Sequence, residues 1–300
     1  MSLDHIDTLL YEELKRNGRA SMEELASVVG LSRVAVRSRV ARLVDSGSLR
    51  VIGIVHPSAQ GVRAFAHLSI NVRGSARAVG QQIAAIDEFP LVSIVAGRAS
   101  LIAEVHARDD SSLRELVRRV RVIEHVAHVE TAVYTERIKD LYAPPGIMPT
   151  TKIDGVDRQI LDTLSEDGRA SYADIARHTQ YSASAIRARV TRLIDHGVVR
   201  ISTVMAPGMV GLQHMCGFGV RLRGVEAIAA IEALALVSYL SLTMSRWDAI
   251  GTVLAPTQAE VVSQFDRIRS IPGVEALQSW THLEVLKENQ HLTAFAALAR

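Results

Sequence analysis

The sequence contains a single cysteine, Cys216, among its 300 residues. An internal disulfide is therefore excluded, and a reducing compartment is expected. The chain has no apolar N-terminal segment typical of a secretion signal, and no uninterrupted apolar run of about 18 residues. Neither export nor membrane spanning is expected, and the predicted location is the cytoplasm.

Common catalytic and metal-binding motifs are also missing. No P-loop, Gly-x-Ser-x-Gly or Cys-x-x-Cys pattern occurs. His125-x-x-His128 has no third ligand nearby, and His214-x-Cys216 falls on a strand face expected to be core, so both are interpreted as ordinary surface or core histidines. We predict no metal, no cofactor and no enzymatic activity.

The net charge is only +2, but the basic residues are segregated. Residues 31–50 contain five arginines and one acid, Asp45, whereas residues 1–30 contain three basic and six acidic residues. Positive potential is thus concentrated on one short segment, which is typical of a nucleic-acid-binding element.

That segment is predicted to be a helix. Val36, Val40 and Leu43 recur at helical spacing, and Ser32 is placed to cap the helix. A shorter amphipathic helix over about 22–29 precedes it, with Ser21 and Glu24 at the spacing of a capping box at its start. Gly30 separates the two helices, and this is the order of a helix-turn-helix. The alternative is an ordinary helical pair whose arginines are merely solvated.

The whole unit returns 150 residues later. Arg187, Val190 and Leu193 each equal the residue 150 positions earlier, and further along the chain Arg246 matches Arg98 with an offset of 148. Because the similarity continues through a switch from helical to strand periodicity, we interpret the chain as a tandem duplication. The repetition favours DNA binding over the solvated-helix alternative.

From Ala64 the apolar period changes from 3.6 to 2, which predicts a strand over 64–72. Helices are then expected at 76–88 and 111–123, and strands at 91–96, 101–106 and 126–134. This order is β-α-β-β-α-β, the ferredoxin-like arrangement, in which both helices cover one face of a four-stranded antiparallel sheet. The other face needs a partner.

We therefore predict an α+β chain of two repeats, each a winged-type helix-turn-helix followed by a ferredoxin-like domain. The helix-turn-helix domains are placed at 1–55 and 153–205, with a wing or hinge strand over 49–55 in the first. The ferredoxin-like domains, for ligand binding and dimerisation, are placed at 58–140 and 208–288. A proline-containing linker at 141–152, able to span at most ~40 Å, and a tail at 289–300 complete the chain.

Several motifs occur in both copies. Asp-x-x-Asp is followed by Gly-Arg-Ala-Ser, then by Arg-x-Arg-Val-x-Arg-Leu, and then by a ferredoxin-like pattern. In this combination each copy resembles a full-length Lrp/AsnC transcriptional regulator. The resemblance implies a factor that binds double-stranded DNA, dimerises sheet to sheet, and often binds an amino acid or related small molecule. We expect an intramolecular pseudo-dimer, able to form homo-oligomers.

The recognition helices of such a dimer would enter major grooves about 34 Å apart. Arg37 and Arg187 are the leading candidates for base or phosphate contact, Arg42 and Arg192 are expected at phosphates, and Arg39 and Arg189 are expected either there or in internal ion pairs. The predicted DNA-contacting residues are Ser32, Arg33, Val34, Arg37, Ser38, Arg42, Ala183, Ser184, Arg187, Ala188 and Arg192. Because these positions differ between the copies, a non-palindromic operator is expected.

The predicted effector site lies at the hairpin between the second and third strands of each ferredoxin-like domain. Family members often carry Gly-x-x-Asp there, and each copy here keeps one half of that pattern. The candidate residues are Gly97, Arg98, Ser100, Arg246, Trp247 and Asp248. An arginine would hold a ligand carboxylate, and Trp247 would stack on an apolar or aromatic group. The alternative is a plain hairpin with a half-buried tryptophan.

Two other functions remain open at this point. Siroheme decarboxylases are similar in overall architecture, but they would be expected to show strands rich in His and Tyr around the ligand, and the basic helices would have no role. A small-molecule binding module without DNA affinity is the third hypothesis. It predicts no salt-sensitive binding to a duplex.

Overall fold

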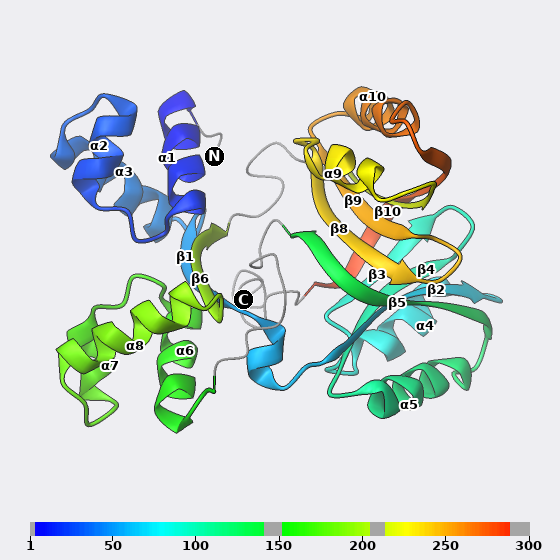
Figure 1. Cartoon of the computed structure of the whole chain (residues 1–300), viewed down its shortest axis with the longest axis horizontal. Coiled ribbons are helices and arrows are strands. Elements are labelled where there is room, and N and C mark those ends of the chain that lie inside the picture. The colour runs from blue at the N-terminus through cyan, green and yellow to red at the C-terminus, as the bar shows by residue number, and fades with distance from the viewer. Residues whose placement is uncertain (1–3, 141–151, 205–213, 289–300) are drawn as a thin grey trace.

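The computed structural model describes residues 4–140, 152–204 and 214–288. Almost all of the predicted linker, the whole predicted tail, and the first residues of the ferredoxin-like domain predicted at 208–288 lie outside these residues. The chain forms two bodies (Figure 1): a helical unit built from both helix-turn-helix segments, and a β-barrel built from both ferredoxin-like segments. In the described residues no helix is both long and apolar enough to cross a membrane.

The first helix-turn-helix contains α1 (His5–Arg16), α2 (Met22–Val29) and α3 (Arg33–Asp45), and the second contains α6 (Gly155–Glu166), α7 (Tyr172–Arg177) and α8 (Ala183–Asp195). The predicted capping box at the start of α2 is confirmed, because Ser21 and Glu24 each accept a hydrogen bond from the backbone N–H of the other. Gly30, with φ of 68°, provides the left-handed residue that separates α2 from α3.

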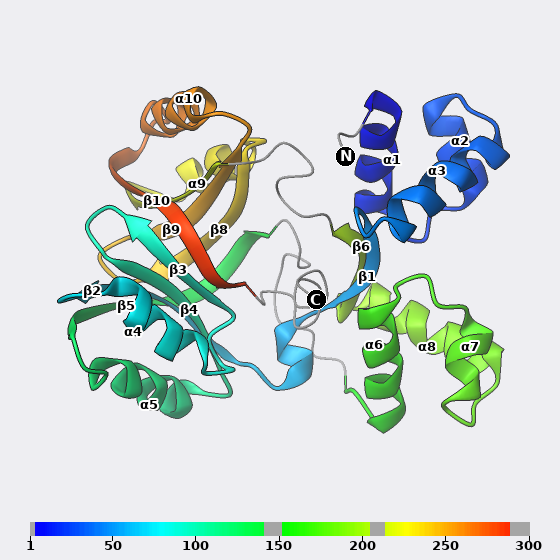
Figure 2. The ribbon, with the colours of Figure 1, turned by 180° about the vertical axis from the view of Figure 1, so that it is seen from behind.

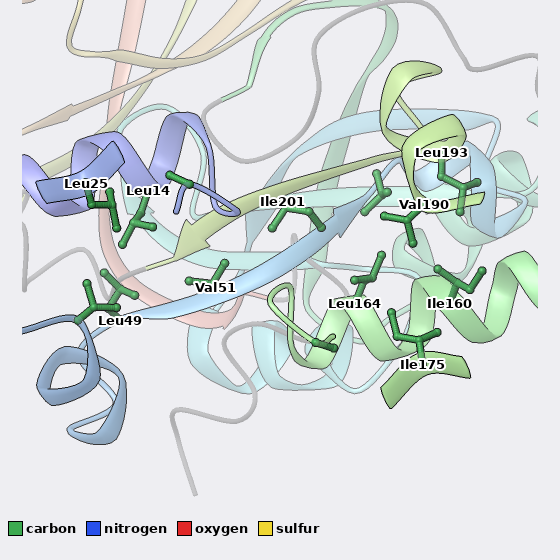
Figure 3. Close-up of a cluster of buried hydrophobic side chains, with 14 of the residues drawn as sticks. Leu14, Leu25, Leu49, Val51, Ile160, Leu164, Ile175, Val190, Leu193 and Ile201 are labelled. Carbon is green, nitrogen blue, oxygen red and sulfur yellow. The ribbon is translucent and has the colours of Figure 1, made fainter. Parts of the chain in front are cut away.

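A strand follows each helix-turn-helix: β1 (Arg50–Val55) and β6 (Val199–Val204). The two strands pair with each other in antiparallel register, with Gly53 opposite Ile201. The strand predicted over 49–55 is confirmed as β1, which leads from α3 toward the barrel and pairs with the strand of the other copy. Figure 3 shows the result, a single hydrophobic core to which both units contribute. Its members include Leu14, Leu49, Leu164, Leu193 and Ile201.

A short 3-10 turn, η1 (Pro57–Gln60), leads into the first ferredoxin-like segment. Its elements are β2 (Ala64–Val72), α4 (Ala76–Ala84), β3 (Leu91–Ala96), β4 (Leu101–Ala107), α5 (Asp110–Arg121) and β5 (Val126–Asp140). The second segment has β7 (His214–Leu222), α9 (Glu226–Glu232), β8 (Val237–Met244), β9 (Ala249–Ala255), α10 (Gln258–Arg269) and β10 (Val274–Glu288). The predicted β-α-β-β-α-β order is confirmed in both.

The two sheets join at both edges and close into one barrel with the strand order β10-β3-β4-β2-β5-β8-β9-β7. The closing pairs cross between the copies: β5 pairs with β8, and β10 pairs with β3. In Figure 2 the helices α4, α5, α9 and α10 lie outside the barrel, where they cover the apolar cores of its two halves. The uncovered faces of the two predicted sheets therefore become the inside of one barrel.

Candidate nucleic-acid interface and ligand cavity

The two proposed recognition helices are α3 and α8. Ser32 caps α3 by accepting a hydrogen bond from the N–H of Ala35 at 3.2 Å, and Ser182 caps α8 in the same way. Helical periodicity buries Val36, Val40 and Leu43 in α3, and Ile186, Val190 and Leu193 in α8. The remaining faces stay open to solvent, and Val34 is 79% exposed.

The solvent-facing sides carry the residues predicted to contact DNA. The structure exposes Arg33, Val34, Arg37 and Ser38 on α3, and Ala183, Ser184, Arg187 and Ala188 on α8. Among the described residues no carboxylate forms an ion pair with Arg33, Arg37 or Arg187. These three guanidinium groups therefore meet the basic requirement for a phosphate or guanine contact, which is an uncompensated positive charge on an exposed helix face.

The other arginines of α3 bind carboxylates at the start of α1. Arg39 binds Asp4 at 2.6 Å and Asp7 at 2.9 Å, so the structure selects the ion-pair alternative for this residue. Arg42 was expected at a phosphate, but its Nη2 binds the buried carboxylate of Asp7 at 2.7 Å. Arg42 binds this carboxylate because α1 holds Asp7 within reach of it. Since Asp7 is buried, its carboxylate has the arginines as partners in place of water.

The second copy repeats this network. Arg189 binds Asp154 and Asp157 at 2.8 Å each, and Arg192 binds Asp157 at 2.6 Å. Asp157 is fully buried, and Arg192, like Arg42, was expected at a phosphate. Both guanidinium groups remain about half exposed, with side-chain exposures of 49% for Arg42 and 40% for Arg192. Their first role is to hold the recognition helix on the helix that carries Asp-x-x-Asp.

A reciprocal clamp fixes the two units against each other. Arg19 donates a hydrogen bond to the carbonyl of Ala170 at 2.9 Å, and Arg169 donates to the carbonyls of Gly18 and Ala20 at 3.0 and 2.9 Å. The sequence reading used the Gly-Arg-Ala-Ser motif only as a sign of family resemblance and missed this function. Its repetition in both copies was the available signal.

The predicted effector residues separate into two groups. Arg98, Arg246 and Trp247 meet at one cavity inside the barrel, although they come from different copies. Gly97, Ser100 and Asp248 do not line it. Ser100 Oγ accepts a hydrogen bond from the N–H of Val72 at 3.3 Å, and the Asp248 carboxylate accepts one from the N–H of Leu222 at 2.7 Å. Ser100 and Asp248 therefore connect their hairpins to neighbouring strands.

The cavity holds about 640 Å³, counting the space at its mouth, and side chains from both sheets line it. Arg246 is anchored there by an ion pair with Glu130 at 2.5 Å, by a hydrogen bond to Gln278 at 3.2 Å, and by the ring of Trp247 at 4.8 Å. The lining residues are His67, Ser69, Asn71, Arg98, Ala99, Ile102, His128, Glu130, Ala132, Arg246, Trp247, Ile250, Gln278 and Trp280.

Deeper in the barrel, polar side chains pair with one another. The Glu104 carboxylate accepts a hydrogen bond from Tyr134 at 2.6 Å and lies 3.0 Å from His67 Nδ1. Burial raises the pKa of Tyr134 and raises that of its neighbour Tyr239 too. Sequence reasoning assigned the apolar residues of β2 to the core but did not recognise that the alternate residues, His67 among them, form an interior of their own. No group of three or more potential metal ligands occurs in the described parts of the chain.

Burial lowers the pKa of His282, inside the barrel, to about 4, with a smaller contribution from His67. As pH falls below about 6.5 the unfolded chain takes up this proton first, so folding stability present above pH 6.5 is lost progressively down to pH 4. We expect His282→Asn to reduce this loss by roughly 1–3 kcal/mol. Urea unfolding at pH 7 and pH 4.5 measures the effect. An equal acid-induced loss in both proteins would contradict it.

Comparison with known proteins places these features in one family. Residues 3–44 and 153–194 match the AsnC-type helix-turn-helix domain, and residues 63–144 match the Lrp/AsnC ligand binding domain. The transcriptional regulator LrpA of Mycobacterium tuberculosis is 31% identical over 135 residues, which are 44% of this chain and 90% of LrpA. An uncharacterised HTH-type transcriptional regulator of Pyrococcus abyssi is 27% identical over 146 residues, 48% of this chain and 92% of the relative.

The solved structure of the siroheme decarboxylase NirDL aligns with this chain at a TM-score of 0.67 and 14% sequence identity. The alignment covers 99% of this chain and 100% of the decarboxylase chain. At that identity the likeness shows the fold alone. The sequence relatives each align with about one repeat, as a duplicated chain requires. The chain belongs to the Lrp/AsnC family of DNA-binding transcriptional regulators, and it is a tandemly duplicated member.

Proposed function

We propose that one chain does the work of a regulator dimer, placing α3 and α8 on two unequal half-sites of one operator. The observation that carries this proposal is the pair of exposed helices with uncompensated arginines, held together by a shared core and a two-stranded sheet. Arg33, Val34, Arg37 and Ser38 would read one half-site, and Ala183, Ser184, Arg187 and Ala188 the other. Ser32, Arg42 and Arg192 would add contacts to the backbone of the DNA.

We further propose that the chain acts in the cytoplasm and assembles into homo-oligomers of pseudo-dimeric chains. A small molecule in the barrel cavity modulates it through Arg98, Arg246 and Trp247. It acts without catalysis: the named sequence relatives are transcriptional regulators, and the likeness to the decarboxylase is one of fold. A tetrapyrrole absorbance band in the purified protein would favour the enzymatic alternative.

Arg37→Ala and Arg187→Ala test the reading of separate half-sites. Each should lower affinity about 10–100-fold, because a guanidinium contact to a base contributes ~1–3 kcal/mol, and each should erase protection in one half of the footprint only. The measurement is footprinting and binding to the DNA upstream of the gene and its neighbours across a salt series. Wild-type affinity should fall steeply with salt as counterions are released.

Arg121→Ala is the matched control, because it removes the same charge from α5 on the outside of the barrel. It should leave the footprint unchanged. Equal loss of protection in both halves for either test variant would count against separate reading of two half-sites. Affinity that is insensitive to salt would count against DNA binding itself.

A further inference from the structure

The barrel cavity is built from two corresponding but unequal halves. The strand registers define the correspondence: Ser69 lies opposite Glu130 in the first copy, and Gly219 lies opposite Gln278 in the second. The residues of the two hairpins correspond in the same way. Leu101 pairs with Ile70 in the first copy, and Ala249 pairs with Val220 in the second. Ala99 of the first copy therefore occupies the place that Trp247 occupies in the second.

The half around Arg246 is complete. The indole of Trp247 lies flat against Gly219, where an added Cβ would come within 2.7 Å of the ring. The Arg246 guanidinium stacks over the same ring at 4.8 Å, and its Nε meets the Glu130 carboxylate at 2.5 Å. This arginine thus has both an aromatic ring and a carboxylate as partners.

The half around Arg98 lacks both partners. No ring of the described residues stacks on Arg98, because Ala99 stands in place of Trp247, and Trp280, which also lines the cavity, packs against His67. The carboxylate is missing because the residue corresponding to Glu130 is Gln278, a neutral amide already bonded to Arg246. No carboxylate of the described residues lies within ion-pair distance of Arg98, and Ser69, Asn71, Arg98 and Ala99 all line the cavity.

We propose that the cavity binds one small aromatic carboxylate per chain, whose ring and carboxylate replace at Arg98 the two partners that Trp247 and Glu130 provide at Arg246. This inference rests on the proposed effector role of the cavity. The second half does not take a ligand because Trp247 fills it. Duplication followed by divergence has thus left one open site and one closed site, where two identical subunits would present two equal ones.

Isothermal titration calorimetry with benzoate and with indole-3-carboxylate tests the ligand class. We expect saturable binding of at least one of them, with one molecule per chain. Cyclohexanecarboxylate lacks the aromatic ring and indole lacks the carboxylate, so each should bind at least about 10-fold more weakly. Two molecules per chain, or binding of neither aromatic carboxylate, would overturn the proposal.

Two variants close the open half with the chain's own groups. Ser69→Gly combined with Ala99→Trp copies the Gly219 and Trp247 arrangement, and Gln278→Glu places a carboxylate at the position that corresponds to Glu130, where it is expected to pair with Arg98. Both should fold, and both should weaken binding of the aromatic carboxylate by at least about 10-fold. Arg121→Ala, outside the barrel, is the control and should bind like the wild type. Undiminished binding in both closing variants would overturn the site.

The effect of the bound carboxylate on operator affinity is measured separately. If the calorimetric result holds and DNA affinity does not change, the site stands and its proposed role as an effector site fails. If calorimetry shows no binding while the salt-dependent footprint persists, the ligand inference fails and the proposed DNA-reading function stands.

Discussion

Gly168→Val, like its counterpart Gly18→Val, is expected to destabilise the paired helix-turn-helix unit by about 3 kcal/mol, because overpacking against an unyielding neighbour costs this much or more. An added Cβ at Gly168 would lie 2.8 Å from the carbonyl carbon of Ile52, and one at Gly18 would lie 2.9 Å from that of Ile201. These neighbours are backbone atoms of β1 and β6, which cannot move without breaking the ladder that joins the copies.

The glycines cannot move away from the strands either. The N–H of Gly168 donates to the carbonyl of Val51 at 2.9 Å, and that of Gly18 donates to the carbonyl of Ile201 at 3.1 Å. A valine side chain must therefore push the copies apart, and the recognition helices lose their fixed spacing. Operator affinity should fall with stability, because simultaneous binding of both half-sites requires that spacing.

Gly155→Ala is the matched control for these glycine variants. Gly155 is the first residue of α6, and an added Cβ there meets nothing within 4 Å. Alanine should be neutral or slightly stabilising, since it favours the helix. Thermal unfolding and footprinting of the three variants give the comparison. Wild-type behaviour of both valine variants would show that the contact between the copies is not tight in solution.

Local patterns in the sequence predicted the individual elements well. Alternation over 64–72 predicted β2, and Ser21 with Glu24 predicted the start of α2; the structure confirms both. Each depends on residues close in sequence, so the physical cause is contained in the pattern itself. The duplication was visible for the same reason, because matching residues repeat at a fixed offset.

Long-range pairing could not be predicted in this way. The strand predicted to end at Tyr134 continues to Asp140, and the added residues Glu136–Asp140 pair with β8, about 100 positions later. Nothing local marks these residues as strand, because pairing with the other copy supplies their hydrogen bonds. For β1 the strand itself was predicted over 49–55, but its pairing with β6 of the second copy was not.

For the sites too, local features could be predicted from the sequence, and contacts between distant elements could not. Exposure of Arg37 follows from helical periodicity and was predictable. The ion pairs of Arg39 and Arg42 depend on Asp7, which lies on another helix, so the sequence left the role of Arg39 undecided and did not predict that Arg42 also binds this carboxylate. The cavity forms only where both copies meet, and its asymmetry became clear when the strand registers showed that Glu130 and Gln278 occupy corresponding positions.

Asp157→Asn is expected to destabilise the second helix-turn-helix by about 2–3 kcal/mol, and Asp7→Asn should do the same in the first. The carboxylate of Asp157 is buried and binds Arg189 and Arg192 together. Removing one partner of a buried ion pair costs about 3–5 kcal/mol, but these arginines retain side-chain exposures of 23% and 40%, so hydration recovers part of that loss.

The neighbouring carboxylate cannot compensate. Asp154 caps α6 by accepting the N–H of Asp157 at 2.8 Å, it already binds Arg189, and half of its side chain is exposed. The hydrogen bond from the backbone of Asp157 lowers the pKa of Asp154, so this carboxylate is already fully charged at neutral pH and has no further charge to offer.

Limited proteolysis and urea unfolding should therefore show residues 153–204 opening before residues 4–55 in Asp157→Asn, and the reverse order in Asp7→Asn. Asp162→Asn is the control, because it removes a charge from the exposed face of the same helix, α6. If Asp157→Asn behaved like this control, the buried carboxylate would not be what holds α8 in place. The orientation of the recognition helix would then have to come from its apolar face and from the remaining ion pair between Arg189 and Asp154.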